Sequence, residues 1–288
     1  MFIDDTMARI LEIIKEHKAY PGKKRTGTFT TGIVSDIGKH KIFLFFAGSN
    51  HAGENAQEFL KKRSAELDRI QYMCDALPCN MPKNLAAIII NCLAHARRNF
   101  IDVEDHFPEQ CAKVIASFAE IYKHDAEAKE QQMSDDERLA HHQKYSKPVM
   151  DELKTWCEQQ IAEHLVEPNS GLGAAINYLL KHWDKLTQFL RVAGAALDNN
   201  IVEESLKIPI RLRKSAYFYA TRYSAFIGSM LTSIILTAAR AGANPVEYLT
   251  ALQQYKTEVH KSPQDWMPWN YAEAILKLQP ATVVAAAA

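Results

Sequence analysis

The sequence predicts a mixed α/β fold in which a sheet-forming region is interrupted by a long run of helices. Two segments, 28–34 and 41–47, are rich in the β-branched and aromatic residues that favour strands. After Cys92 the apolar residues recur with the period of a helix over roughly a hundred residues. A single crossover between strands needs far fewer residues, so we expect an α-helical insertion between two parts of one mixed domain.

The composition is that of an ordinary globular protein. The chain has 288 residues, of which 47% are hydrophobic, and its 34 Lys and Arg balance 34 Asp and Glu. This composition excludes a disordered chain, and the low Gly and Pro content excludes a collagen-like fibre. The longest apolar stretch, 230–239, is interrupted by Ser and Thr and is too short to cross a bilayer. We therefore expect no membrane partner.

Two further features predict a cytoplasmic location. Asp4 and Asp5 occupy the place where a secretory signal would carry basic residues. The five cysteines, an odd number spread along a long chain, favour reduced thiols over a disulfide framework.

The first third of the chain is expected to form strands and one helix. The two strand segments flank a turn that contains Gly38, which predicts a hairpin. Residues 54–67 have the apolar spacing of a helix, and 69–74 have the pattern of a short strand. Residues 86–92 are either a buried strand or the start of a helix. Only three residues precede Asp4, which predicts a short first strand.

The rest of the chain is expected to be helical. Ser134 and Glu137 have the spacing of a capping box. Gly242 follows the last apolar position of one helix, and Pro245 opens the next. The last residues, 281–288, are expected to be a disordered tail. The predicted helices span 93–103, 109–130, 134–164, 172–190, 226–241 and 245–255.

Three carboxylates stand out by their context. Asp4 follows an apolar run at the start of the chain, Asp75 follows a predicted strand, and Glu203 lies in the segment LDNNIVEESL. Carboxylates that meet at adjacent strand ends are suited to hold Mg²⁺ or Mn²⁺. Two such ions can activate a water and stabilise the leaving oxygen in phosphoryl transfer. The same positions equally fit acids that serve as turn residues.

Glu203 has a second interpretation. If Asn200 is the N-cap of a helix, Glu203 stands three residues later and forms a capping arrangement that the helix dipole favours. Asp198 and Asn199 are then turn formers. On spacing alone, the capping role is the better supported of the two.

Four residues have a spacing that resembles a structural zinc site. Cys74, Cys79, Cys92 and His95 follow the pattern C-x4-C-x12-C-x2-H. Against this, Cys74 lies inside a predicted strand, and Cys92 and His95 lie at a junction between a strand and a helix. Buried thiols explain the cysteines without a metal, and we favour that interpretation.

The neutral net charge hides a basic segment. Residues 205–224 carry five cations and no acid. Basic side chains can contact phosphates, and the neighbouring aromatic residues can stack on bases or pack nearby. The alternative is an amphipathic core segment whose charges face water. Arg97 and Arg98 form a second basic pair. The aromatic residues of the basic segment are Tyr217, Phe218, Tyr219 and Tyr223.

In their order along the chain, these segments resemble one protein family. The chain contains FIDDT, MCDAL, CLAHARRNF, LDNNIVEESLKIPIRLRKSAYFY, ANPVEYL and WMPWNY. This order is similar to the catalytic portion of the insertion-sequence family 66 transposases, which belong to the DDE superfamily. Members carry a D-D-T segment, a C-W/L-A-H-A-R-R-K-F segment, and D-N-N-x-x-E-R-A-L-R followed by R-K-N. The resemblance covers nearly the whole chain, and its AHARR and DNN-x-x-E segments are specific.

The resemblance implies a ribonuclease H-like fold. Such a fold has a mixed sheet, and here it would carry a large α-helical insertion and a helical C-terminal part. Residues 1–107 would be the first part of the catalytic core, 108–190 the helical insertion, and 191–280 the remainder of the core with the C-terminal helices.

By the same resemblance, Asp4, Asp75 and Glu203 are the catalytic residues and the ligands of a two-metal site for Mg²⁺ or Mn²⁺. The chain departs from the family pattern at Glu204, which replaces Arg, and at Ser215, which replaces Asn. The residues expected to support the carboxylates are His95, Asp198, Asn199 and Asn200. The residues expected to bind DNA are Arg97, Arg98, Arg213 and Lys214.

The activity implied is metal-dependent DNA strand cleavage and transfer at insertion-sequence ends. The end-recognising region of the family is absent from this sequence, so the resemblance implies an N-terminally truncated fragment. The implied partners are end and target DNA, together with further copies of this chain or an amino-terminal transposase half. The cytoplasmic protein would associate with the bacterial nucleoid when bound to DNA. The alternative is a catalytically inactive remnant that binds DNA or a full-length transposase partner.

Overall fold

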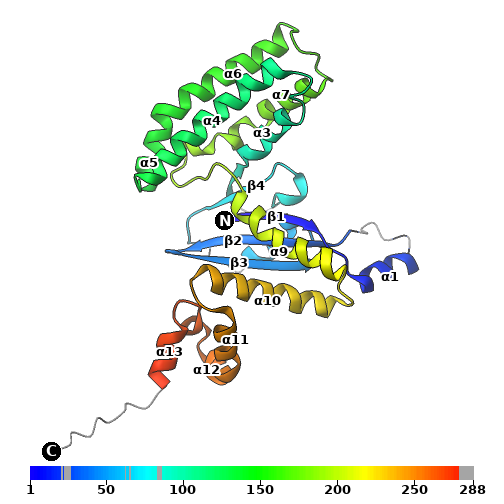
Figure 1. Ribbon diagram of the computed structural model, residues 1–288, viewed down its shortest axis with the longest axis vertical. Helices are drawn as coiled ribbons and strands as arrows, with labels where there is room; N and C mark the ends of the chain where they lie inside the picture. Colours follow the sequence, from blue (N-terminus) through cyan, green and yellow to red (C-terminus); the bar gives the residue numbers. More distant parts are fainter. Residues whose placement is uncertain (21, 23–26, 62, 65, 83–85, 279–288) are drawn as a thin grey trace, which may run out of the picture. The chain divides into compact units, whose positions relative to one another are not determined.

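Figure 1 shows the computed structural model of the chain, which describes residues 1–278 apart from 21, 23–26, 62, 65 and 83–85. The chain divides into two compact units. The first contains Met1–Asp4 and His51–Glu204, and the second contains Asp5–Asn50 and the chain from Ser205 onward. The tail expected at 281–288 lies outside the described residues.

The strands form one five-stranded mixed sheet. They are β1 (Phe2–Met7), β2 (Phe29–Ile37), β3 (His40–Gly48), β4 (Ile70–Cys74) and β5 (Ala87–Asn91), in the order β3-β2-β1-β4-β5. β1 is parallel to β4, with Phe2 opposite Met73, and β4 is parallel to β5, with Cys74 opposite Asn91. β2 and β3 are antiparallel. The expected mixed α/β fold class is confirmed.

The strands agree with the sequence except at β1. The predicted hairpin is confirmed, and Gly38 in its turn has a φ of 57°, a left-handed conformation that glycine adopts at little cost. Residues 87–91 form a strand, which removes the ambiguity at 86–92. The expectation of a short first strand is wrong, because β1 has six residues and continues past Asp4.

The first unit is mainly helical. Its helices are α2 (Ala52–Leu60), α3 (Leu93–Ile101), α4 (Pro108–Glu130), α5 (Asp135–His141), α6 (Lys147–Ala162), α7 (Gly171–Lys181) and α8 (Trp183–Leu186). The apolar faces of α3, α4, α6 and α7 pack around a core that includes the buried side chains of Phe100, Phe118 and Leu153. The predicted capping box is confirmed, since Ser134 N–H donates to the Glu137 carboxylate at 2.8 Å and the Ser134 hydroxyl accepts from Glu137 N–H.

Two predicted helices are shorter than expected. The helix expected at 54–67 ends at Leu60, and Leu67, a later apolar position of the expected face, is exposed. The helix expected at 134–164 is interrupted by a π-helical turn, His142–Ser146, between α5 and α6. Such turns insert one extra residue into a helix and are often functional. This turn places the side chain of His142 in the interior, where it is 1% exposed.

The single helix expected at 172–190 is wrong. α7 ends at Lys181, α8 is a single turn, and a 3-10 turn follows at Gln188–Leu190. The hydroxyl of Thr187 donates to the carbonyl oxygen of Trp183 at 2.7 Å. Side-chain bonds of this kind slightly destabilise and often bend a helix, and this one lies where α8 ends.

The second unit combines the β2–β3 hairpin with helices. They are α1 (Leu11–Ala19), which the sequence does not predict, α9 (Asn200–Ala216), which enters this unit at Ser205, α10 (Arg222–Arg240), α11 (Pro245–Gln254), α12 (Lys256–Lys261) and α13 (Tyr271–Leu278). α10 lies along β3. Phe43 N–H donates to Thr237 Oγ1 at 3.1 Å, and Phe45 N–H donates to Ser233 Oγ at 2.8 Å. These bonds occupy edge donors of β3 that would otherwise be open to another strand.

The helices predicted at 226–241 and 245–255 are observed as α10 and α11, although α10 begins earlier, after a Thr221 cap. Within the described residues, no single helix is long and apolar enough to cross a membrane. α10 and α11 meet the length and composition test only as a pair, and they are bent by 120° at the break between them.

Candidate carboxylate site

Two of the predicted acids meet near the carboxyl end of β4. Asp4 lies within β1, and Asp75 follows the last residue of the neighbouring parallel strand β4. The side-chain amide of Asn80 donates to both carboxylates, at 3.3 Å to Asp4 Oδ1 and at 2.8 Å to Asp75 Oδ1. Two adjacent carboxylates repel each other, and a shared donor offsets part of that repulsion. One amide therefore holds the two acids on either side of it.

No sequence pattern points to Asn80. It ends the 3-10 turn Pro78–Asn80, it is 1% exposed, and its carbonyl oxygen accepts a hydrogen bond from Tyr72 OH at 2.7 Å. Gly53 of α2 lets this turn approach closely, because a Cβ there would lie 2.5 Å from the carbonyl oxygen of the residue after the turn. The only available signal is that it is the one polar side chain in the short loop 76–82 that follows Asp75.

Asp75 keeps one oxygen open to a ligand. Its Oδ1 accepts hydrogen bonds from Asn80 and from Leu77 N–H, the latter at 3.2 Å. In the described part of the chain, Oδ2 of Asp75 has no hydrogen-bond donor. Burial, reinforced by the negative charge of Asp75, raises the pKa of Tyr178 on α7 to about 12. Tyr178 is therefore neutral near pH 7 and adds no charge beside the carboxylate.

The third predicted acid, Glu203, lies in the first turn of α9 and meets α3. Its Oε1 is 3.5 Å from His95 Nδ1, and its Oε2 is 3.9 Å from Arg98 Nη2. Both Oε1 and His95 Nδ1 are buried atoms without a hydrogen-bond partner among the described residues. Buried polar atoms without a partner are uncommon in folded proteins. This pair therefore marks a place where an additional group can bind.

The capping interpretation of Glu203 is wrong, because α9 does not have Asn200 as its N-cap. The carbonyl oxygen of Asn199, and not that of Asn200, accepts the first helical bonds, from Val202 N–H at 3.1 Å and Glu203 N–H at 3.2 Å. The N-cap position therefore falls on Asn199. Among the contacts of the described residues, the Glu203 carboxylate meets His95 and Arg98 of α3 and not the backbone of its own first turn.

Among the described residues, one set of three metal-ligating side chains lies close enough to share an ion. Cys92, His95 and Glu203 each place one ligand atom within 4.8 Å of the others. The structure thus puts Glu203 with His95 and Cys92, and it puts Asp4 with Asp75. Burial raises the pKa of the Cys92 thiol to about 12, so the thiol is protonated near pH 7.

The four-residue zinc pattern is not assembled. Within the described residues, Cys74 and Cys79 do not belong to the set that contains Cys92 and His95. Cys74 and Cys92 are buried, and all five cysteines are free thiols. The favoured interpretation, that these cysteines are packing residues, agrees with this arrangement.

Asn199 connects the helix of Glu203 to two other elements. Its side-chain Nδ2 donates to the carbonyl oxygen of Ile3 at 2.9 Å, and its backbone N–H donates to Cys92 Sγ at 3.3 Å. The residue is fully buried. Because Ile3 directly precedes Asp4, Asn199 fixes the backbone beside the first acid while it starts the helix that carries Glu203.

We expect the Asn199→Asp variant to be less stable. The substitution replaces the donor to Ile3 O with a carboxylate oxygen and buries a charge. A buried group left unsatisfied costs about 1–3 kcal/mol, and more when it is charged. Urea unfolding should therefore show a loss of roughly 2 kcal/mol or more. Asn200→Asp, at an exposed neighbour, is the matched control and should change stability by less than about 0.5 kcal/mol. Equal losses in both variants would contradict this role of Asn199.

The helices after α3 fix the loop that precedes α9. Arg138 Nη1 donates to the carbonyl oxygen of Ala195 at 3.0 Å, and Arg138 Nε donates to Asp125 Oδ1 at 2.8 Å. The Asp125 carboxylate, 4% exposed, also contacts Lys129 at 2.6 Å and His142 at 3.2 Å. A buried ion network between α4, α5 and the π-helical turn thus anchors the chain just before the Asp198–Asn200 segment.

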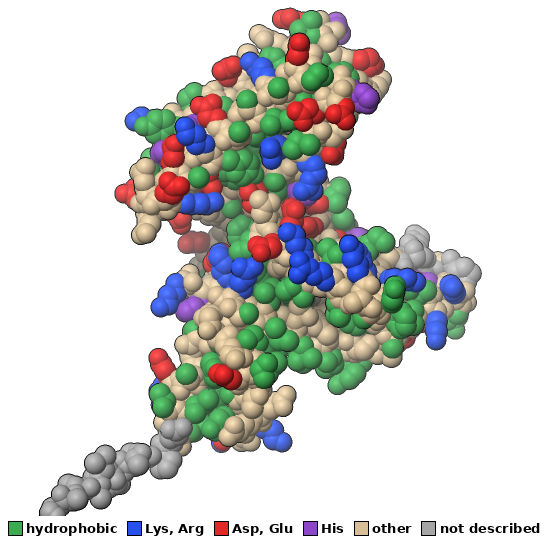
Figure 2. Space-filling model, in the orientation of Figure 1, with side chains coloured by type: hydrophobic (Ala, Val, Ile, Leu, Met, Phe, Trp, Pro, Cys, Tyr) green, Lys and Arg blue, Asp and Glu red, His purple; other side chains and the backbone are tan. Residues whose placement is uncertain are grey.

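The residues predicted to bind DNA lie on two helices. Arg97 and Arg98 are on α3, where Arg98 faces Glu203. Arg213 and Lys214 are in the last turn of α9, where Arg213 Nη1 donates to the carbonyl oxygen of Met7. Figure 2 shows Lys and Arg side chains gathered along α9.

Two curated relatives match part of the chain. The uncharacterized protein y4jD of Sinorhizobium fredii (strain NBRC 101917 / NGR234) is 31% identical over 186 residues, which cover 62% of this chain and 35% of the relative. The uncharacterized protein y4hP of the same strain is 24% identical over 244 residues, covering 80% of this chain and 44% of the relative. The chain therefore spans less than half the length of either relative. No solved structure matches.

The family is shown by its sequence profile. The profile described as "Transposase IS66 family" matches residues 1–226. This match includes Asp4, Asp75 and Glu203 together with the segments that surround them. Because it covers more than half of the sequence, the chain belongs to the IS66 family of transposases.

Proposed function

We propose that the chain supplies the catalytic part of a DDE-type transposase, which cleaves DNA at insertion-sequence ends and transfers the strand. The observation that carries the proposal is the pair of Asp4 and Asp75, held together by Asn80 on adjoining parallel strands. Membership of the IS66 family supplies the substrate class, DNA. The strand order β3-β2-β1-β4-β5, with β1, β4 and β5 parallel, supports a ribonuclease H-like core.

In this proposal, residues 1–107 and 191–280 form the core, and 108–190 are a helical insertion. The ion network around Asp125 lies in the insertion and holds the loop at Ala195. This contact gives the insertion a positioning role, because the same loop leads directly into the helix that carries Glu203.

The residues present fit a divalent metal. Carboxylate oxygens are the hard ligands that Mg²⁺ and Mn²⁺ prefer, and Oε1 of Glu203 is buried without a hydrogen-bond partner among the described residues. Asp4, Asp75 and Glu203 would hold the metal, which supplies Lewis acidity for phosphoryl transfer. His95, through its contact with Oε1, would orient the Glu203 carboxylate.

The proposal is tested by strand cleavage. The full chain is incubated with supercoiled plasmid that carries the insertion-sequence ends, with Mg²⁺, with Mn²⁺ or with a chelator. We expect nicked plasmid only when the metal is present. Plasmid that is bound but never nicked would contradict the catalytic proposal.

One observation favours the second candidate, an inactive remnant that binds DNA or a full-length transposase partner. Among the described residues, Glu203 groups with Cys92 and His95 and not with the pair of Asp4 and Asp75. In a remnant, the basic residues would still contact phosphates without any cleavage. The plasmid assay separates the two candidates, because only the transposase produces metal-dependent nicks.

Replacing the four predicted DNA-binding residues by alanine should flatten the salt dependence of DNA binding. Each phosphate contact contributes about 0.9 to the slope of log K against log salt concentration, so four contacts predict a decrease of roughly 3 to 4. Fluorescence anisotropy with a labelled duplex at several salt concentrations measures this slope. The variant carries alanine at Arg97, Arg98, Arg213 and Lys214.

The control for this measurement removes the same charge elsewhere. It carries alanine at four lysines that form surface ion pairs, namely Lys61, Lys113, Lys147 and Lys154. We expect its slope to stay close to that of the unmodified protein. An equal change in both variants would show that net charge alone, and not a defined surface, governs binding.

A further inference from the structure

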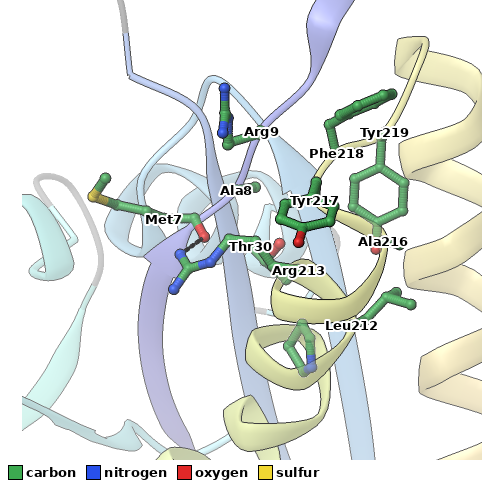
Figure 3. A pocket seen from close by; sticks show the side chains of 11 residues that line it. Met7, Ala8, Arg9, Thr30, Leu212, Arg213, Ala216, Tyr217, Phe218 and Tyr219 are labelled. Carbon is green, nitrogen blue, oxygen red and sulfur yellow. Dashed lines mark hydrogen bonds between the residues drawn. The ribbon is translucent and has the colours of Figure 1, made fainter.

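A small pocket in the second unit lies where the end of β1 meets the end of α9 (Figure 3). Its volume is about 100 Å³, and the described residues that line it include no acid. Figure 3 shows the rings of Tyr217, Phe218 and Tyr219 toward one side of the view and the side chains of Met7 and Arg213 toward the other. The pocket thus combines aromatic walls with a guanidinium group.

Tyr219 has a structural role in this pocket. Its N–H donates to Arg9 O at 2.8 Å, and its carbonyl oxygen accepts from Leu11 N–H at 2.9 Å. Its ring packs against Ile10 and over Gly228, where a Cβ would lie 2.8 Å from the ring. The fold therefore uses Tyr219 to attach the segment after α9 to the start of α1.

Tyr217 and Phe218, in contrast, present their rings to solvent. Tyr217 is 64% exposed and Phe218 is 47% exposed. About half or more of each residue's surface is left outside the fold, so packing within the protein accounts for only part of these rings. They are free to stack on a flat ligand.

The backbone of Tyr217 is strained. It follows the last residue of α9 with a φ of 65°, the left-handed conformation that glycine usually provides at the end of a helix. A residue with a Cβ pays roughly 1 kcal/mol or more for this conformation. Because the ring is exposed, the fold gains little from having tyrosine here. Strain of this kind concentrates at functional sites.

The charge around the rings favours an anion. The segment 205–224 has five cations and no acid, and Arg213 is held at the pocket by its bond to Met7 O. Apolar walls do not suit a phosphate itself, but they do suit a base attached to one. Bases in a duplex are already stacked on each other, whereas an unpaired base can stack on a protein ring.

We propose that this pocket binds a nucleobase of single-stranded DNA, which stacks on Tyr217 and Phe218 while Arg213 and Lys214 contact the adjacent phosphates. The choice of DNA rests on the proposed function. Every base has a flat face, so the pocket accepts different bases and does not read sequence.

The test uses the full chain and short single strands of equal length. One strand is all thymidine, one is abasic throughout, and one contains 2-aminopurine. We expect 2-aminopurine fluorescence to be quenched on binding, as stacking requires. Tyr217→Ala should weaken binding of the thymidine strand roughly tenfold or more, the effect of losing one stacked base. The abasic strand should bind both proteins equally.

Two further variants separate loss of the ring from loss of the fold. Tyr217→Phe keeps the ring and should bind the thymidine strand as the unmodified protein does. Tyr217→Gly removes the ring but relieves the left-handed strain, so it should raise thermal stability and still weaken binding. The proposal is overturned if Tyr217→Gly binds normally, or if Tyr217→Ala weakens binding of the abasic strand as much as that of the thymidine strand.

The pocket proposal and the proposed activity are tested by different measurements, so one can be contradicted without the other. Glu203→Gln should abolish nicking and leave the 2-aminopurine signal unchanged. Quenching by a protein that never nicks DNA would overturn the activity and support the pocket. Nicking by a protein that gives no quenching would overturn the pocket and support the activity.

Discussion

The Asp75→Asn variant should lose at least about 100-fold of the metal-dependent nicking rate. Asn keeps an oxygen that can accept the bonds from Asn80 and Leu77 N–H, so the loop should retain its structure. What the variant loses is the negative charge. A bound metal contributes several kcal/mol of transition-state stabilisation, and each 1.4 kcal/mol or so corresponds to a factor of ten. Glu203→Gln should have a similar effect for the same reason.

The matched control is Asp5→Asn. Asp5 is the neighbour of Asp4 on β1, and successive side chains of a strand point to opposite faces. Its replacement should therefore leave the nicking rate within roughly twofold. DNA binding, measured by anisotropy, should be unchanged in all three variants. A normal rate in Asp75→Asn, or an equal loss in Asp5→Asn, would remove the carboxylate pair from the mechanism.

The elements that local sequence determines were predictable. The hairpin follows from two runs of β-branched and aromatic residues around Gly38, and the capping box follows from the spacing of Ser134 and Glu137. α1 could not be found in this way, because Ile13 is its only fully buried residue within the described chain and its apolar pattern is weak. A helix with a single buried side chain is stabilised mainly by residues from distant parts of the chain, and its own sequence does not reveal them.

Tertiary contacts explain the other differences. The break between α5 and α6 places His142 against Asp125, a residue of a different helix, and no helical periodicity encodes such a pairing. The same holds at the site. The position of Asp75 at a strand end was predictable, but the bridging role of Asn80 depends on a turn packed beneath Gly53.

The site also shows why a residue can be predicted without its contacts. The capping interpretation implied a helix after Asn200, and α9 is that helix and contains Glu203, yet the partner of Glu203, His95, lies on α3, far away in the sequence. The left-handed conformation of Tyr217 could not be predicted from the sequence either. A helix that ends in the left-handed conformation usually carries glycine there, so tyrosine gives no signal of a helix end.

The largest effect on stability is expected from Asp125→Ala. The substitution leaves the buried His142 and the partly buried Arg138 without their carboxylate. Removing one member of a buried ion pair typically costs about 3–5 kcal/mol. Urea unfolding at neutral pH measures this loss. Asp151→Ala is the control, since Asp151 forms an exposed ion pair with Lys147 and should contribute less than about 1 kcal/mol.

The effect of Asp125 should depend on pH in a defined direction. Burial alone would raise the pKa of this carboxyl, but hydrogen bonds from His142 and Lys129 and the charge of Arg138 hold it well below its ordinary value. The folded protein then binds fewer protons at this site than the unfolded chain does. The stabilisation is therefore complete above the unfolded pKa of about 3.9 and is lost as the pH falls through the lower, folded pKa.

The stability difference between the unmodified protein and Asp125→Ala should accordingly be constant from about pH 7 to pH 5 and shrink below about pH 4. A difference that stays constant into acid, or one no larger than that of Asp151→Ala, would contradict the network. Because Arg138 also binds the carbonyl oxygen of Ala195, its release should loosen the loop before Asn199. Asp125→Ala should then lower the nicking rate even at a temperature where the protein remains folded.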